Sequence, residues 1–155
     1  SRNAVIFRDE VLPIWSIINQ TKLMAEVINQ SSSSTARCPR SVAWVTPHLG
    51  TIKINVDGRS RGNPGNSRFG GLLRDNLGQW IVGFSGFCGF TTNIFAELQA
   101  IHQGLLLAWN MGYRSVVCES DSTVTLHLIN ETYHNWHLFA FLIKKIQELK
   151  GRQWM

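Results

Sequence analysis

Residues 54–65 read I-N-V-D-G-R-S-R-G-N-P-G, and the predicted architecture is built around them. Ile54 and Val56 alternate with polar residues, which predicts a strand that turns its apolar side chains to one face and Asp57 to the other. Glycines and an Asn-Pro pair follow at once, so the strand is expected to end in a turn. Asp57 therefore lies on a rigid element among small and basic residues, a setting suited to chemistry on a phosphate group.

The remaining pattern predicts an α/β domain with a mixed sheet. Strands are expected at about residues 51–57, 68–74, 79–89 and 115–120, and helices at about residues 91–110, 122–130 and 138–150. The first three strands form an antiparallel meander, and a crossover through the long helix leads to a parallel fourth strand. Asp75 is predicted to be a hairpin-turn residue. The last residues, 151–155, fit the start of a further strand.

A separate N-terminal segment is expected before this domain. Residues 2–7 are predicted to be extended, and apolar spacing typical of a helix follows at residues 9–30. A serine-rich stretch at residues 31–41 has the composition of a linker. We therefore expect residues 1–41 to be a helical segment with its linker, and residues 42–155 to be the main domain.

Composition narrows the classes of protein to which the chain can belong. The 155 residues include six Trp and eight Phe and are 44% hydrophobic, which favours a folded domain over disorder. No apolar run approaches the roughly 20 residues that span a bilayer, and the N-terminus lacks a signal-peptide pattern, so no membrane partner is expected. Cys38, Cys88 and Cys118 are far apart, which fits a reducing, intracellular compartment and argues against a zinc site. Nucleus and cytoplasm both stay open.

The charge distribution has two interpretations. The formal net charge of +5 fits either solubility or a polyanionic partner such as a nucleic acid. Arginines gather around Asp57, where they form either a solvated face or contacts with phosphate groups that carry no sequence information. They are Arg59, Arg61, Arg68 and Arg74.

Three acidic residues stand at places where one shared site could form. Asp57 ends the first strand, Glu97 lies on the long helix and Asp121 ends the fourth strand. If the first and fourth strands are neighbours, the connecting helix carries Glu97 past the point where both strands end. Each residue also has an ordinary structural interpretation, as a turn residue, a solvated helix residue and a helix cap respectively. Glu119 is a weaker candidate, because no second motif accompanies it.

Three carboxylates crowded together repel one another unless a cation neutralises them. Hard oxygen ligands select Mg²⁺ or Mn²⁺, which bind phosphate oxygens as well. Two such ions about 4 Å apart can activate a water molecule and stabilise the leaving oxygen when a phosphodiester bond is hydrolysed. The three acids would then hold metal rather than act as general acids and bases themselves.

Three motifs occur in order along the chain: D-G-x-x-x-G-N-P-G at residues 57–65, T-T-N-x-x-A-E-L at 91–98 and E-S-D-S at 119–122. Together they resemble ribonuclease H type 1. More closely, residues 44–150 resemble the RNase H-like domain of plant non-LTR retroelement reverse transcriptases. The motif R-N-x-x-I-F at residues 2–7 is similar to the segment that precedes this domain in such polyproteins.

The resemblance implies an RNase H-like fold that hydrolyses the RNA strand of RNA–DNA hybrids with two Mg²⁺ or Mn²⁺ ions, and a reverse transcriptase domain before it in a longer polyprotein. It implies that Asp57, Glu97 and Asp121 are the catalytic, metal-binding carboxylates. Other residues are implied to bind the substrate, partly through the 2′-hydroxyl groups of RNA. These are Gly58, Asn63, Asn93 and Ser122.

The chain also departs from the family pattern. Ile94 and Phe95 stand where the family often has Asn and Arg, which weakens the expected grip on substrate. The family continues to a further strand, a loop histidine and a fourth Asp on a final helix, whereas this chain ends at Met155. We therefore expect the last strand and helix to be missing, one sheet edge to be exposed and the second ion to be poorly held. The alternatives are an inactive nucleic-acid-binding module on the same scaffold and a protein-interaction domain.

Overall fold

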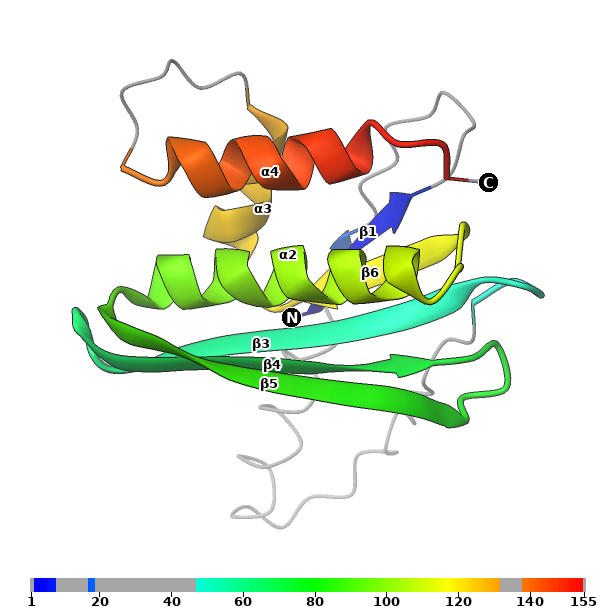
Figure 1. The fold of residues 1–155 in the computed structure, drawn as a ribbon, viewed down its shortest axis with the longest axis horizontal. Helices are drawn as coiled ribbons and strands as arrows, with labels where there is room; N and C mark the ends of the chain where they lie inside the picture. The colour runs from blue at the N-terminus through cyan, green and yellow to red at the C-terminus, as the bar shows by residue number, and fades with distance from the viewer. Residues whose placement is uncertain (1, 8–16, 19–46, 132–137, 155) are drawn as a thin grey trace, which may run out of the picture.

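Strand β3 (Ile52–Gly62) runs through the middle of the sheet and carries the residues around Asp57. This computed structural model describes residues 2–7, 17–18, 47–131 and 138–154, which form a six-stranded sheet in the order β2-β1-β6-β3-β4-β5. Helices lie on one side of the sheet (Figure 1). The mixed α/β sheet predicted from the sequence is therefore confirmed.

Three strands form the predicted antiparallel meander, and each is longer than its sequence pattern indicated. After β3 come β4 (Gly65–Arg74) and β5 (Trp80–Thr91), paired in sequence order. Gly62 turns the chain between β3 and β4 with a φ of 98°, which glycine adopts without steric cost. Asp75 closes the next turn, because its Oδ1 accepts the backbone N–H groups of Leu77 and Gln79. The predicted role of Asp75 is thus confirmed.

The crossover through the long helix brings the fourth predicted strand next to the first. The long helix α2 (Asn93–Asn110) starts at Thr92, whose side chain accepts the N–H of Phe95 as an N-cap. The chain then enters β6 (Val116–Ser120), which pairs in parallel with β3 up to Asn55 opposite Glu119. The condition for a shared acidic site, neighbouring first and fourth strands, is met.

The core lies between the sheet and α2. Ile54, Leu73, Ile101 and Leu105 are fully buried there, since the period of β3 and of α2 directs their apolar side chains to the same layer. Helix α4 (Ala140–Lys150) covers α2 on its far side, as Figure 1 shows.

Helix α3 (Thr123–Asn130) follows β6 and packs against both α2 and α4. No helix of the described residues is long and apolar enough to cross a membrane.

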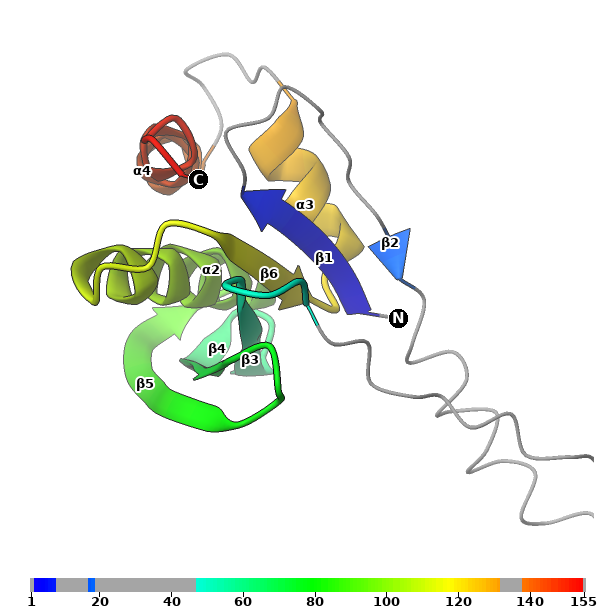
Figure 2. The same cartoon turned by 90° about the vertical axis from the view of Figure 1, so that its right-hand side faces the viewer.

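The N-terminal residues join the sheet rather than leaving its edge bare. Strand β1 (Arg2–Phe7) pairs antiparallel with β6, from Asn3 opposite Ser120 to Phe7 opposite Val116, and Figure 2 shows the two side by side. The expectation of an exposed edge beside β6 is therefore wrong. Strand pairing between distant segments leaves no local pattern from which it could have been read.

The predicted helix at residues 9–30 is wrong where the structure describes it. Ile17–Ile18 form the short strand β2, which pairs with β1. Both residues are β-branched, which favours an extended backbone. The rest of that predicted helix and the linker at residues 31–41 lie outside the described residues, so the division at residue 41 stays a prediction.

The expectation of a further strand after α4 is also wrong over residues 151–154, which form a turn and an irregular stretch. Trp154 is buried, donates its indole N–H to the Leu149 carbonyl at 2.7 Å and packs edge-on against Trp109. The indole thus anchors this segment to the helical layer. Trp154 is thus a packing residue of the helical layer and not part of a strand.

Candidate metal centre

The structure brings the three predicted carboxylates together. Asp57, Glu97 and Asp121 each offer an oxygen, and these oxygens lie within 4.8 Å of one another. Asp57 lies on β3, Glu97 on α2 and Asp121 directly after β6. The parallel pairing of β3 with β6 ends at Asn55 opposite Glu119. Asp57 and Asp121 each follow this last pair by two positions, so they lie at the same end of the two strands.

Glu97 is the buried member of this cluster. It is only 6% exposed, so the interpretation of Glu97 as a solvated helix residue is wrong. Burial raises its pKa to about 7, and the charges of Asp121 and Asp57 add to the effect. Hydrogen bonds from the Gly58 N–H and the Ser120 hydroxyl favour the charged form, but they do not offset burial. The site is thus strongly negative whenever all three groups are ionised.

Gly58 allows α2 to approach β3 closely enough to build the site. A Cβ at this position would lie 2.3 Å from the carbonyl carbon of Ala96 and 2.3 Å from the nitrogen of Glu97. Only glycine fits against backbone atoms at that distance. Gly58, predicted to contact substrate, has the structural task of seating Glu97 beside Asp57; a substrate contact stays a prediction.

Ser120 is a site residue that the sequence reasoning missed. Its hydroxyl donates to Glu97 Oε2 at 3.3 Å and accepts the N–H of Ser122 at 3.1 Å. It is 1% exposed and therefore links the helix carboxylate to the loop that carries Asp121. Strand alternation could have indicated this contact, because Ser120 points to the α2 side of the sheet when Glu119 points to the opposite side.

Asp121 is not a helix cap. That task belongs to Ser122, whose Oγ accepts the N–H of Thr125 and lies 2.6 Å from the Thr125 hydroxyl. The carboxylate of Asp121 is therefore left exposed beside Asp57 and Glu97. The predicted contact of Ser122 with substrate stays a prediction, and its hydroxyl is already engaged within the domain.

Asn63 and Asn93 bridge the β3–β4 turn and the start of α2. The Asn93 N–H donates to Asn63 Oδ1 at 3.1 Å, and the Ser60 N–H donates to Asn93 Oδ1 at 2.6 Å. Both side chains are exposed, and their amide NH₂ groups have no hydrogen-bond partner among the residues that the structure describes. The turn therefore presents two donors to a ligand, whereas the amide oxygens serve the fold.

The donor set fits a hard divalent cation. Three carboxylate oxygens converge, two of them from exposed side chains, and none of the three acids is paired with Lys or Arg in the described part of the chain. Carboxylate oxygens are the ligands that Mg²⁺ and Mn²⁺ prefer. The burial of Glu97 adds a reason for a cation, because a buried carboxylate next to two others is costly to ionise alone.

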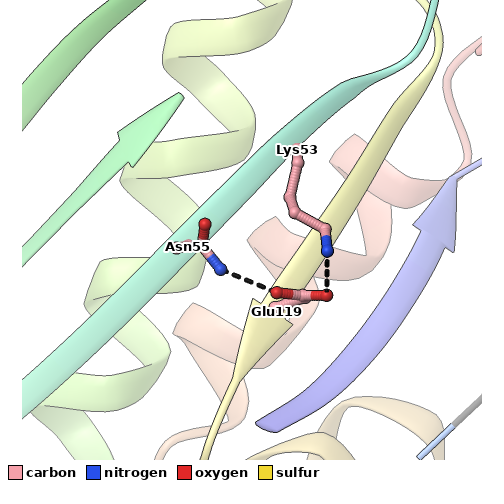
Figure 3. A network of polar contacts seen from close by, with 3 residues as sticks. All are labelled: Lys53, Asn55 and Glu119. Carbon is pink, nitrogen blue, oxygen red and sulfur yellow. Dashed lines mark hydrogen bonds and ion pairs between the residues drawn. The ribbon is translucent and has the colours of Figure 1, made fainter. Parts of the chain in front are cut away.

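A buried polar network holds the two strands at the approach to the site (Figure 3). Lys53 Nζ lies 2.7 Å from Glu119 Oε1, and Asn55 Nδ2 donates to Glu119 Oε2 at 2.7 Å. Lys53 and Asn55 belong to β3 and Glu119 to β6, so the network cross-links the strands directly before Asp57 and Asp121. Glu119 is therefore a structural acid outside the cluster, as its weaker candidacy suggested.

The raised pKa of Glu97 predicts opposite pH dependences for stability and for cation binding. The folded protein holds this proton more tightly than the unfolded chain, where the pKa is near 4.5. Its contribution to stability is therefore fully present below pH 4.5 and is lost as the pH rises through about 7 without divalent cations. Affinity for Mn²⁺ should rise over the same interval, because the cation binds the deprotonated carboxylate.

Thermal unfolding and isothermal titration with Mn²⁺ across this interval measure both effects. Glu97→Gln is the matched control, because the amide cannot titrate and should flatten both curves. If the pH dependences survived in Glu97→Gln, another group would be responsible for them.

Comparison with known proteins places the chain among RNase H-type domains. A family model described as "Reverse transcriptase-like" matches residues 55–154. A curated Arabidopsis thaliana protein, whose name proposes it to be a ribonuclease H protein, is 36% identical over 119 residues, which is 77% of this chain but 19% of that protein. The chain thus spans about a fifth of the length of this relative.

Solved structures show the same fold. RNase H1 from Halobacterium salinarum NRC-1 superposes with a TM-score of 0.57 at 23% identity, over 64% of this chain and 76% of that one. LC11-RNase H1, isolated from compost by a metagenomic approach, was crystallised with an RNA/DNA hybrid. It superposes with a TM-score of 0.53 at 27% identity, over 64% of this chain and 75% of that one.

Proposed function

Because this chain belongs to the reverse transcriptase-like family of RNase H-type domains, we propose that it hydrolyses the RNA strand of RNA–DNA hybrids with divalent cations. The observation that carries the proposal is the convergence of Asp57, Glu97 and Asp121 within 4.8 Å. The hybrid bound by LC11-RNase H1 supports the choice of substrate. In a longer protein, a reverse transcriptase domain before this one would supply such hybrids.

The residues of the chain divide the work. Asp57, Glu97 and Asp121 would hold Mg²⁺ or Mn²⁺, with two ions in a complete site. When bound, the cations neutralise the phosphate and activate the attacking water. The free amide NH₂ groups of Asn63 and Asn93 are suited to donate to the 2′-hydroxyl of RNA, which DNA lacks.

A second candidate function is a nucleic-acid-binding module without catalysis. One observation favours it: among the described residues, three carboxylates converge on the site and no fourth one joins them. A site with three carboxylates holds a second ion less firmly than one with four. Both candidates require binding to the hybrid, and only the first requires metal-dependent cleavage.

Asp57→Asn is expected to slow cleavage of the RNA strand by at least about 100-fold. Substituting a residue that only orients a metal ligand already lowers activity or metal affinity about 10- to 100-fold, and Asp57 is proposed to be a ligand itself. The measurement uses a hybrid with labelled RNA, incubated with Mg²⁺ and the complete chain. Asp75→Asn is the matched control, since this turn aspartate lies outside the cluster and an amide oxygen can still accept its two hydrogen bonds. It should cleave at the unmodified rate.

The result also separates the two candidates. Cleavage that Asp57→Asn leaves unchanged would remove Asp57 from the site. Binding of the hybrid without cleavage by the unmodified chain, in either Mg²⁺ or Mn²⁺, would favour the non-catalytic module.

A further inference from the structure

A row of three side chains crosses the sheet beside the carboxylates. Arg59 on β3 lies directly opposite Arg68 on β4, and Arg68 lies directly opposite Phe87 on β5. Gly58 faces α2, so strand alternation places Arg59 on the opposite face of the sheet. Asp57 is on that same face, two residue pairs before this row.

The arginines of this face lack an anionic partner. Arg59, Arg61 and Arg68 are exposed and form no ion pair with any of the residues described. Like charges directly across a strand pair destabilise a sheet, so the Arg59–Arg68 pair costs stability as it stands. An anion bound between the two guanidinium groups would relieve this repulsion.

The row lies in a groove that continues from the carboxylates. One hollow is lined by Asp57, Asp121, Arg59 and Arg68 among others. A second, with a volume of about 700 Å³, is lined by Arg59, Arg61, Arg68 and Phe87 among others. The two hollows share Arg59 and Arg68, so a chain of phosphates that leaves the carboxylate cluster meets the arginines next.

We propose that this groove, lined by Arg59, Arg61, Arg68 and Phe87, binds a single-stranded extension of the nucleic acid held at the carboxylates. The inference rests on the proposed function for the identity of that nucleic acid. The arginines match the phosphates of the extension. Phe87 is 63% exposed and offers its ring to an unpaired base, whereas the bases of a duplex already stack on one another.

The test compares hybrids with and without a tail. Fluorescence anisotropy in the Asp57→Asn chain, which leaves the probes intact, measures the affinity for a blunt hybrid, for one with a single-stranded RNA tail and for one with a DNA tail. We expect a tail of at least one kind to tighten binding about tenfold. Phe87→Leu should remove most of this gain.

Charge variants test the arginines. Arg59→Gln with Arg68→Gln should abolish the gain and lower the salt dependence of tailed-hybrid binding by about 0.7 for each lost phosphate contact. Lys144→Gln with Lys145→Gln removes two charges from α4, which lies beyond α2 from the sheet, and should retain the gain (Figure 1).

Equal affinity for blunt and tailed hybrids would overturn the inference, as would a gain that survives both Phe87→Leu and the arginine substitutions. Failure of the proposed function looks different. If the unmodified chain cleaves no hybrid but the tail still tightens binding through Phe87 and the arginines, the groove stands and the hydrolytic proposal falls.

Discussion

Gly58→Ala is expected to destabilise the domain by at least about 3 kcal/mol, the upper end of what overpacking usually costs. The new methyl group would lie 2.3 Å from backbone atoms of Ala96 and Glu97, which cannot rotate away as a side chain can. Strand β3 and helix α2 would have to separate, and the N–H of Gly58 would leave the Glu97 carboxylate. Urea unfolding measures the stability, and Mn²⁺ titration measures the loss of the site.

Gly83→Ala is the matched control for this substitution. Gly83 is also a strand glycine, but a Cβ there would find its nearest neighbours at 3.6 Å or more, which is ordinary contact. It should unfold near the urea concentration of the unmodified chain. Equal stability and equal Mn²⁺ affinity for Gly58→Ala would show that α2 can shift without cost, and would contradict the close approach as the origin of the site.

Lys53→Met is expected to cost about 3–5 kcal/mol of unfolding free energy, because it leaves one charge of a buried ion pair without its counterion. The side chains of Lys53 and Glu119 are 3% and 1% exposed. Without Lys53, the Glu119 carboxylate would retain the Asn55 amide as its described hydrogen-bond partner. Chemical denaturation measures the loss, and Mn²⁺ affinity reports whether Asp57 and Asp121 have moved apart.

A second substitution separates charge from packing. Adding Glu119→Gln to Lys53→Met removes the uncompensated charge while an amide oxygen still accepts from Asn55, so about 1–3 kcal/mol should be regained. A double variant that is no more stable than Lys53→Met would mean that the lysine stabilises the sheet by packing rather than as a counterion.

Local patterns predicted most elements of the fold, and each error has a physical cause. The alternation of Ile54 and Val56 predicted β3 only to about residue 57, whereas the strand continues to Gly62. Its outer part was missed because it carries arginines rather than alternating apolar residues. The helices expected from about residues 91 and 122 begin within two residues of the observed starts of α2 and α3. The pairing of β1 with β6 escaped prediction because it joins segments far apart in the chain.

The acids of the candidate site could be predicted from the sequence, but the contacts that surround them could not. The motifs singled out Asp57, Glu97 and Asp121, and the structure brings them together. The contact of Ser120 with Glu97 and the hydrogen bond from the Asn93 N–H to Asn63 Oδ1 were not foreseen. Each depends on which backbone group lies next to which side chain, and a single strand or helix does not contain that information.

Residue types and their spacing were enough to predict strands β3 to β6, helices α2 to α4, the turn at Asp75 and the three acids, because alternation, helical period and turn chemistry act over a few residues. The tertiary structure alone decided that Glu97 is buried with a pKa of about 7, and that Glu119 pairs with Lys53. It also set Arg59, Arg68 and Phe87 in one row. Desolvation and strand register depend on neighbours distant in sequence, and they exist only once the chain has folded.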